Sequence, residues 1–128
     1  MSLIIERLTD AINVVKDDGT KVNYYLFDEY EIHLNVIPPK TKQVWHFHQN
    51  IEETILITKG EIEVNYLENN QIKKEIIKKD ELVLVKDSIH TFINNSDQDC
   101  HFVVFRLVLN NENKREIFKH DKQVVEID

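Results

Sequence analysis

Four side chains with metal-ligand chemistry stand in the middle of the chain. His46 and His48 are two residues apart in the segment Val-Trp-His-Phe-His, which has the composition of a β-strand. Successive strand side chains point to opposite faces, so both imidazoles emerge on one face, with α-carbons ~6.6 Å apart. Both rings can then bend toward one ion at about 2.1 Å each. Glu52 and Glu53 begin the next strand and either could add a carboxylate, while His90 in a later apolar segment is a fourth candidate.

This set of side chains restricts the identity of the ion. Three imidazoles and one carboxylate suit one divalent transition metal, Fe, Mn, Ni, Co or Zn, rather than the all-oxygen sites of Ca or Mg. Taken alone, the His-x-His pair is equally compatible with hydrogen-bonded histidines on a solvated strand face. The donor set accepts most late first-row ions, so it does not name the metal.

The spacing of these residues also resembles two motifs of the cupin superfamily. The run His46-x-His48-x4-Glu53-x6-Gly60 is similar to the first cupin motif, and Asp80 to Asn94, with His90-x3-Asn94, is similar to the second. The resemblance implies an all-β fold, a small antiparallel β-barrel of the jelly-roll type, also described as a double-stranded β-helix. Carried over by position, it implies that one metal is held by His46, His48, Glu53 and His90. Glu53 is preferred to Glu52 because six residues separate it from Gly60.

The chain departs from the cupin motifs at the turns. Positions that often carry glycine or proline in the family are here occupied by Lys40, Lys79, Val85 and Asp87. In a cupin the four ligand candidates would point inward, where an unpaired polar group costs ~1–3 kcal/mol. A metal would satisfy all four together. The alternative is an empty polar pocket that remains from a degenerate site.

The composition describes a single domain of ordinary globular type, residues 1–128, with the metal-motif core at 40–94. Charged residues make up 30% and hydrophobic residues 41% of 128 positions. The formal charge of −7 disfavours nucleic acid as a partner. No run approaches the roughly 18 apolar residues of a membrane span, and the N-terminus does not look like a signal peptide. With a single cysteine, Cys100, we expect a cytoplasmic protein.

About ten short strands separated by small polar turns are expected, which favours a barrel or sandwich. Residues 31–37 alternate between the polar side chains Glu31, His33 and Asn35 and an apolar face, the pattern of a strand with one buried and one wetter face. Residues 2–16 fit either a strand or a short helix. The polar tail, residues 110–128, could pair as an edge strand or cover the barrel mouth.

Several further residues are candidates for the pocket. His33 is the best candidate for a catalytic acid or base near the metal. Phe92 and Asn94 follow His90 in its own strand phase, and Phe105 and Leu107 share a face of the long apolar strand near the C-terminus. We expect these four side chains to line the cavity, giving it an apolar floor.

These observations support three hypotheses of function. The first is a metal-dependent enzyme acting on a small polar metabolite, with oxygenase or isomerase chemistry. The alternative is a non-catalytic barrel, either small-molecule-binding or regulatory, with a degenerate or structural metal site. Self-association is compatible with both, and the resemblance to small cupins implies a homodimer.

Overall fold

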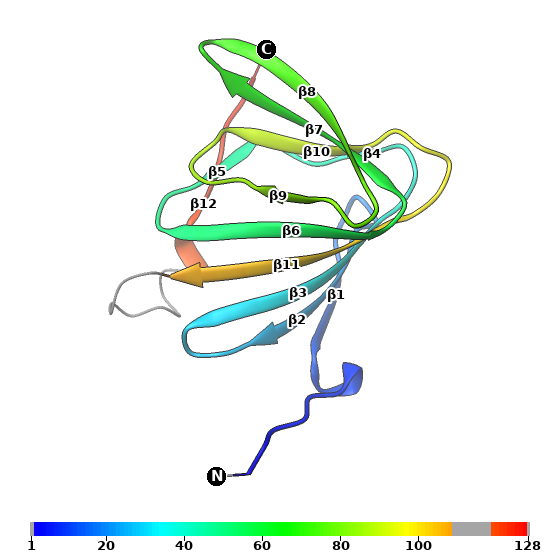
Figure 1. Ribbon diagram of the computed structural model, residues 1–128, viewed down its shortest axis with the longest axis vertical. Helices are drawn as coiled ribbons and strands as arrows, with labels where there is room; N and C mark the ends of the chain where they lie inside the picture. Colours follow the sequence, from blue (N-terminus) through cyan, green and yellow to red (C-terminus); the bar gives the residue numbers. More distant parts are fainter. Residues whose placement is uncertain (1, 109–118, 128) are drawn as a thin grey trace.

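The computed structural model describes residues 2–108 and 119–127 and is built almost entirely from antiparallel β-strands (Figure 1). A 3₁₀ turn at Leu8–Asp10 precedes the first strand. The strands are β1 Ile12–Val15, β2 Lys21–Leu26, β3 Tyr30–Ile37, β4 Thr41–Lys42, β5 His46–His48, β6 Ile51–Lys59, β7 Glu61–Glu68, β8 Gln71–Lys78, β9 Leu82–Leu84, β10 His90–Asn94, β11 Cys100–Val108 and β12 Lys122–Val124.

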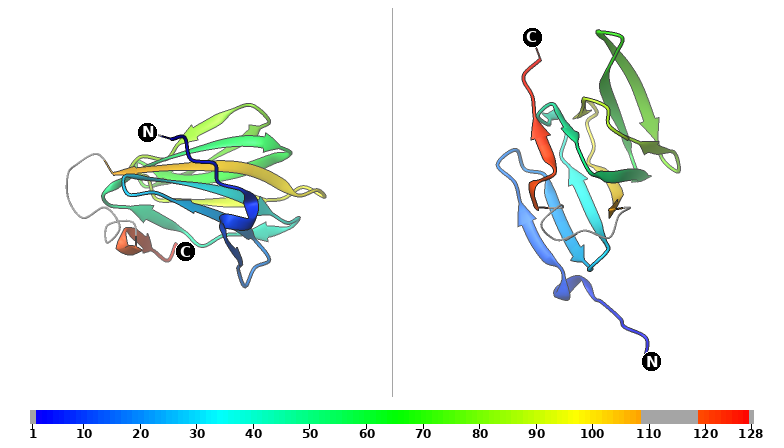
Figure 2. Two further views of the ribbon diagram at one scale, coloured as in Figure 1. Left: turned by 90° about the horizontal axis from the view of Figure 1, so that it is seen from below. Right: turned by 90° about the vertical axis from the view of Figure 1, so that its left-hand side faces the viewer.

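The strands form two sheets. The first, sheet A, has the order β1-β2-β3-β11-β6-β9, and the second, sheet B, has the order β12-β5-β10-β7-β8, with β4 paired to β10. The two sheets lie face to face, as the views in Figures 1 and 2 show. This arrangement confirms the prediction of an all-β, jelly-roll fold. About ten strands are expected from the sequence, and the described residues form twelve.

The hydrophobic core lies between the sheets. It is formed by buried side chains of both: Ile37, Ile55, Ile57, Ile62, Val64, Val85, Phe92, Cys100, Phe102 and Val104. In β6 the buried positions alternate, so that Ile51, Glu53, Ile55 and Ile57 point inward and Glu52 points out to solvent. Strand periodicity therefore carries Glu53 into the interior on the same face as the core isoleucines.

Strand β3 has the opposite arrangement of polarity from the one its alternation suggests. Its buried positions are Glu31, His33, Asn35 and Ile37, whereas the intervening aliphatic side chains are only half-buried on the outside. The polar face of β3 is thus the inner face. The reason is that this part of the interior is a polar cavity rather than dry core.

The chain passes from sheet A to sheet B at Gly60, between β6 and β7. Gly60 has φ +81°, and a Cβ atom there would lie 2.8 Å from the backbone oxygen of Asp99. Lys40 and Asp80 also have positive φ, 58° and 70°. The turns at Lys40 and at Lys79-Asp80 lack the glycine that is frequent in the family. Each of them nevertheless has a residue with left-handed backbone conformation.

Both ends of the chain extend the sheets. Residues 12–15 form the edge strand β1 of sheet A, which decides between the strand and helix alternatives for that stretch. In the tail, β12 pairs with β5, with Lys122 opposite His48 and Val124 opposite His46. The remainder of the tail, residues 109–118 and 128, lies outside the described residues. No helix in the described part of the chain is long and apolar enough to cross a membrane.

Candidate metal centre

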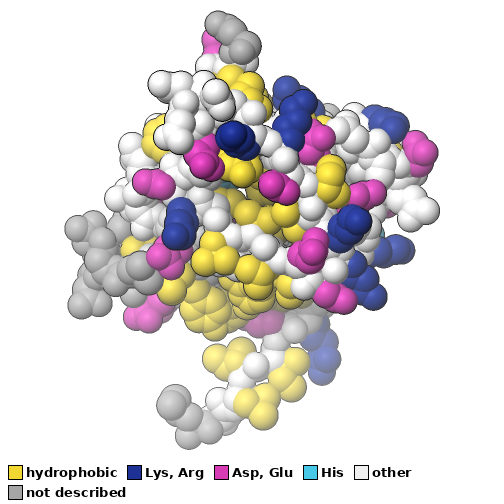
Figure 3. Space-filling model, turned by 45° about the horizontal axis from the view of Figure 1, so that its top comes forward, with side chains coloured by type: hydrophobic (Ala, Val, Ile, Leu, Met, Phe, Trp, Pro, Cys, Tyr) yellow, Lys and Arg dark blue, Asp and Glu magenta, His cyan; other side chains and the backbone are white. Residues whose placement is uncertain are grey.

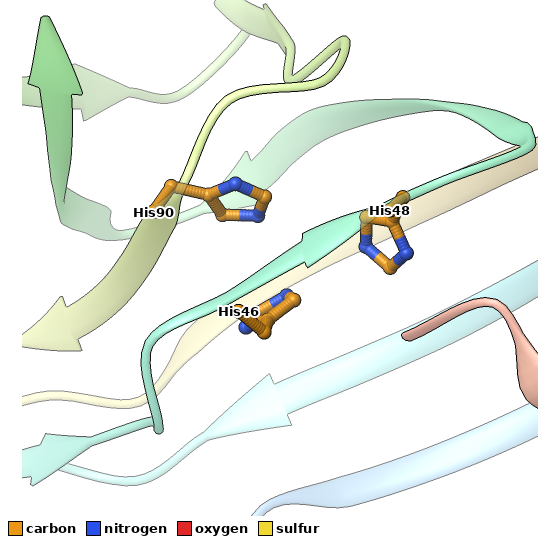
Figure 4. A group of neighbouring side chains, drawn as sticks. All are labelled: His46, His48 and His90. Carbon is orange, nitrogen blue, oxygen red and sulfur yellow. The ribbon is translucent and has the colours of Figure 1, made fainter. Parts of the chain in front are cut away.

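Three histidines from adjacent strands of sheet B converge inside the molecule (Figure 4). His46 and His48 lie on β5, and His90 on β10 is the register partner of His46. All three are buried, with exposed fractions of 6%, 3% and 1%. One ring nitrogen from each lies within 4.8 Å of the others. The same-face spacing of the His-x-His pair and the antiparallel register with β10 together bring the three imidazoles to one point.

The other ring nitrogen of each histidine is tied to an acceptor. His46 Nδ1 lies 2.9 Å from the carbonyl oxygen of Val44, and His90 Nδ1 lies 3.0 Å from that of Ser88. His48 Nδ1 lies 2.9 Å from a carboxylate oxygen of Asp121. Because each acceptor requires a proton on Nδ1, Nε2 is the nitrogen left to bind a metal, and in the neutral rings of His46 and His90 it carries the lone pair. This is the tautomer in which an imidazole binds a metal through Nε2.

The three histidines fit a metal ion. Two ligands at about 2.1 Å from one ion are at most about 4.2 Å apart, so small inward rotations of the rings would close the set. His90 Nε2 is buried and has no hydrogen-bond partner within the described residues. A buried acceptor of this kind is costly unless a ligand or ion satisfies it.

Glu53 lies beside this cluster from the facing sheet. Its Oε2 is 2.9 Å from His48 Nε2 and 3.3 Å from Arg106 Nε. Burial raises the pKa of Glu53, but the hydrogen bond and charge of His48, together with the Arg106 guanidinium, outweigh it and lower the pKa to about 2. Glu53 is therefore a carboxylate at neutral pH, the form in which it can bind a cation.

Burial also keeps two of the histidines neutral. Loss of solvation lowers the pKa of His46 to about 3, and the nearby His90, Lys122 and His48 add to this effect. The pKa of His90 is lowered for the same main reason. Neutral rings with free Nε2 lone pairs are the metal-binding form, so little free energy is needed to deprotonate these two ligands.

Asp121 is a residue of the site that the sequence analysis missed. It lies just before β12, is 1% exposed, and accepts hydrogen bonds from His48 Nδ1 and from the backbone amide of Asn50. It is 73 residues away from His48 in sequence and stands in a polar tail. Nothing local marks it, because only the pairing of β12 with β5 brings it to the histidine.

Arg106 was also missed, although it lies on the long apolar strand β11. Its side chain bridges two carboxylates, with Nη1 3.5 Å from Glu31 Oε1 and Nε 3.3 Å from Glu53 Oε2. The sequence feature that could have identified it is a single arginine in a mainly apolar strand. It indicates an inward charge that must be paired.

The cavity next to the histidines has a volume of about 260 Å³. His33 lines it, with its Nε2 2.8 Å from Glu31 Oε1, and the ring of Tyr24 packs edge-on against it at a centroid distance of 4.5 Å. Burial is the main cause that lowers the pKa of His33, so its ring is neutral at pH 7. The candidate acid–base histidine therefore does lie in the same cavity as His46, His48 and Glu53.

Of the four side chains expected to line the pocket, the structure places Phe92 on the cavity wall and the other three elsewhere. Phe92 lines the cavity, whereas Asn94 is buried at the end of β10 and donates to the backbone oxygens of Ile37 and Gln98. Phe105 and Leu107 are 45% and 40% exposed on the outer face of sheet A. From β11 it is the other strand phase, Phe102, Val104 and Arg106, that faces the cavity. The two faces of β11 are both apolar, so composition alone selected the wrong one.

A second, larger hollow of about 740 Å³ lies between β7, β8 and β9. It is lined mainly by aliphatic side chains and shares His90 with the metal cluster. The smaller cavity is the one that contains His46, His48 and Glu53 together.

Residues 33–106 match the Cupin domain family, which is more than half of the chain. The chain belongs to the cupins. The match begins within β3 and ends within β11, and it includes all four ligand candidates. It confirms the resemblance that the motif spacing indicated.

Solved structures support the same fold. An oxalate oxidase in complex with the substrate analogue glycolate is 19% identical, with a TM-score of 0.65, over 84% of this chain and 60% of that chain. The capsular polysaccharide assembling protein CapF from Staphylococcus aureus is 18% identical, with a TM-score of 0.70, over 91% of this chain and 32% of its own. This cupin therefore spans less than two thirds of these relatives. Peruvianin-I, a cysteine peptidase from Thevetia peruviana latex, is 14% identical over 96% of this chain, 77% of its own, with a TM-score of 0.71.

At these identities the similarity concerns the fold alone. A search of curated proteins finds no match.

Proposed function

We propose that this cupin binds one divalent transition metal through His46, His48, Glu53 and His90 and uses it to transform a small polar metabolite by oxygenase- or isomerase-type chemistry. The observation that carries the proposal is the set of three Nδ1 hydrogen bonds, to Val44, Asp121 and Ser88. Backbone carbonyls and a buried carboxylate fix the tautomer of each ring, which is the arrangement expected around metal-ligating histidines.

The metal would supply Lewis acidity, or electron transfer if it is redox-active. The side chains of the chain itself have separate roles. Asp121 holds the ring plane of His48. Arg106 orients Glu53 and, together with His48, keeps it ionised. The cavity is small, below the roughly 300–1,000 Å³ of drug-sized sites, so the substrate is a small molecule.

His33 is the proposed acid–base residue of the reaction. With Nε2–H donated to Glu31, its neutral ring keeps a lone pair on Nδ1 that can accept a proton from a substrate in the cavity. The Glu31 carboxylate would then stabilise the imidazolium that forms. The His33–Glu31 pair is therefore suited to proton transfer, the step that an isomerisation requires.

Metal analysis of the purified, untagged protein tests the proposal. We expect close to one equivalent of Fe, Mn, Ni, Co or Zn by inductively coupled plasma mass spectrometry, before or after reconstitution. His48→Ala and Glu53→Ala should lose it, whereas His101→Ala, on β11 outside the cavity, should retain it. If the wild-type protein takes up no metal after reconstitution, the metal centre is rejected. The alternative function, a metal-free barrel that binds a small molecule, then remains.

A chelator competition assay, which measures metal affinity, tests the role of Asp121. We expect Asp121→Asn to weaken metal affinity by about 10- to 100-fold, because such outer partners orient their histidine and raise its basicity. Asp99→Asn, in the loop before β11, is the matched control. Equal affinity of Asp121→Asn and wild type in a chelator competition assay would show that the Asp121–His48 hydrogen bond has no role in binding.

A further inference from the structure

The cavity beside the metal cluster is cationic, in a chain whose formal charge is −7. Among the side chains that line it, one is a carboxylate, Glu53. Four are positively charged: Lys16, Arg106, Lys119 and Lys122. Arg106 is already paired with Glu31 and Glu53. The three lysines form no ion pair with any residue in the described ranges 2–108 and 119–127.

The position of Lys122 is fixed by the strand pairing. It lies opposite His48 in the β12–β5 register, and residues directly opposite in an antiparallel pair point to the same face. Its ammonium therefore projects on the side of the ligand imidazoles.

Lys16 reaches the same mouth from the other sheet. It follows β1, the edge strand of sheet A, directly, and its side chain lines the same cavity as Lys122. The two lysines thus approach one cavity from different sheets, Lys16 from sheet A and Lys122 from sheet B. Two like charges held together in this way repel one another, and an anion between them removes the repulsion.

We infer that the substrate is a small anion whose negatively charged group is held by Lys122 and Lys16 at the mouth of the cavity. This inference deepens the proposed function and rests on it in one respect, since the rest of the anion would then lie beside the metal. The chemistry shared by the candidates is a compact anionic group, a carboxylate or a phosphate. Glu53 and Glu31 are buried and both are paired with Arg106, which offsets one of their two charges, whereas Lys16 and Lys122 are exposed at the mouth.

Calorimetric titration with malonate and with its neutral analogue malonamide tests the inference, at low ionic strength and on both metal-free and metal-loaded protein. We expect malonate to bind and malonamide to bind at least tenfold more weakly. Lys122→Gln and Lys16→Gln should each weaken malonate binding by about fivefold, the size of effect expected for a partly solvated ion pair. Lys74→Gln, on exposed β8, should leave it unchanged, and added salt should weaken it.

The outcomes separate the two proposals. Malonate binding that is no tighter than that of malonamide, or that is unaffected by either lysine substitution, overturns the anion site even if the metal is present. Lysine-dependent malonate binding in a protein that takes up no metal supports the anion site and rejects the metal centre. Titration with inorganic phosphate identifies the source of the group: tighter binding of phosphate than of malonate supports a phosphorylated substrate, and the reverse order supports a carboxylic acid.

Discussion

The hydrogen bond at Nδ1 of each histidine determines which nitrogen faces the cavity. Two of the three acceptors, Val44 and Ser88, are backbone carbonyls two residues before the histidine they hold. Local chain geometry thus orients His46 and His90, whereas His48 depends on a carboxylate from the distant tail. Local geometry therefore orients two of the three histidines, and the third requires the tail to be in place.

The ligand candidates could be selected from the sequence because metal chemistry uses few side-chain types at short, regular spacing. His46, His48 and His90 were selected in this way, and the structure places them together. Asp121 and Arg106 could not be selected, since a single aspartate or arginine acquires its role only through a partner from a distant strand.

The lowered pKa values of the histidines predict that the metal-free protein loses stability in mild acid. Below pH 6.5 an unfolded chain protonates its histidines, whereas buried His46 stays neutral down to about pH 3. The unfolded state then binds more protons, so the free energy of unfolding falls as pH falls. His46 alone should remove about 2 kcal/mol between pH 7 and pH 5. His33 and His90 act in the same direction, and Glu53 adds its share below about pH 4.5.

Urea denaturation with a chelator present, at pH 7 and pH 5, measures this dependence. His46→Gln should show a smaller difference between the two pH values than wild type. His101→Gln should behave as wild type does. Equal free energies of unfolding at the two pH values would contradict the prediction.

At the scale of elements, strand phase decides which residues reach the site. In β6 the buried positions alternate regularly, and Glu53 follows its aliphatic neighbours inward. In β3 and β11 the sequence indicates which residues share a face, but it does not indicate which of the two faces is buried. Both faces of β11 are apolar, and in β3 the polar face turned out to be the buried one. Which face is inside depends on the sheet that packs against it, and no single strand contains that information.

The turn at Gly60 is the element-scale feature with the clearest physical requirement. Gly60→Ala would place a Cβ atom 2.8 Å from the Asp99 backbone oxygen at a φ of +81°. We expect a loss of about 2 kcal/mol, from left-handed backbone strain and the contact together. For a domain of this size that corresponds to a melting temperature lower by about 7 °C.

Thermal unfolding followed by circular dichroism measures the change, with Lys59→Ala at the neighbouring exposed position as the control. A Gly60→Ala protein that melts with wild type would show that the corner between β6 and β7 relaxes without cost.

At the scale of the whole molecule, the outer face of sheet A is unusually apolar for a solvent-exposed surface. Tyr30, Phe105 and Leu107 are 43%, 45% and 40% exposed, and Leu82 and Leu84 on the edge strand β9 are 54% and 58% exposed. The strand order β3-β11-β6-β9 makes these positions neighbours across one sheet. In Figure 3 hydrophobic side chains gather in a central patch on the face shown, with charged side chains around it. A polar rim around an apolar centre is typical of a contact surface.

The homodimer expected from the sequence stays a prediction, and this face gives it a location. A second copy meeting the first about a two-fold axis would cover the same apolar patch on both chains, which is the commonest way small proteins self-associate. Multi-angle light scattering should then give twice the chain mass of 15.2 kDa. Phe105→Glu should yield the monomer, because it would bury an unpaired charge at the contact, whereas Lys73→Glu on exposed β8 should remain dimeric. Metal content measured on the Phe105→Glu monomer shows whether the centre, which is built within one chain, is independent of assembly. A monomeric wild-type protein at micromolar concentration would reject the dimer and leave the apolar face without a partner of its own kind.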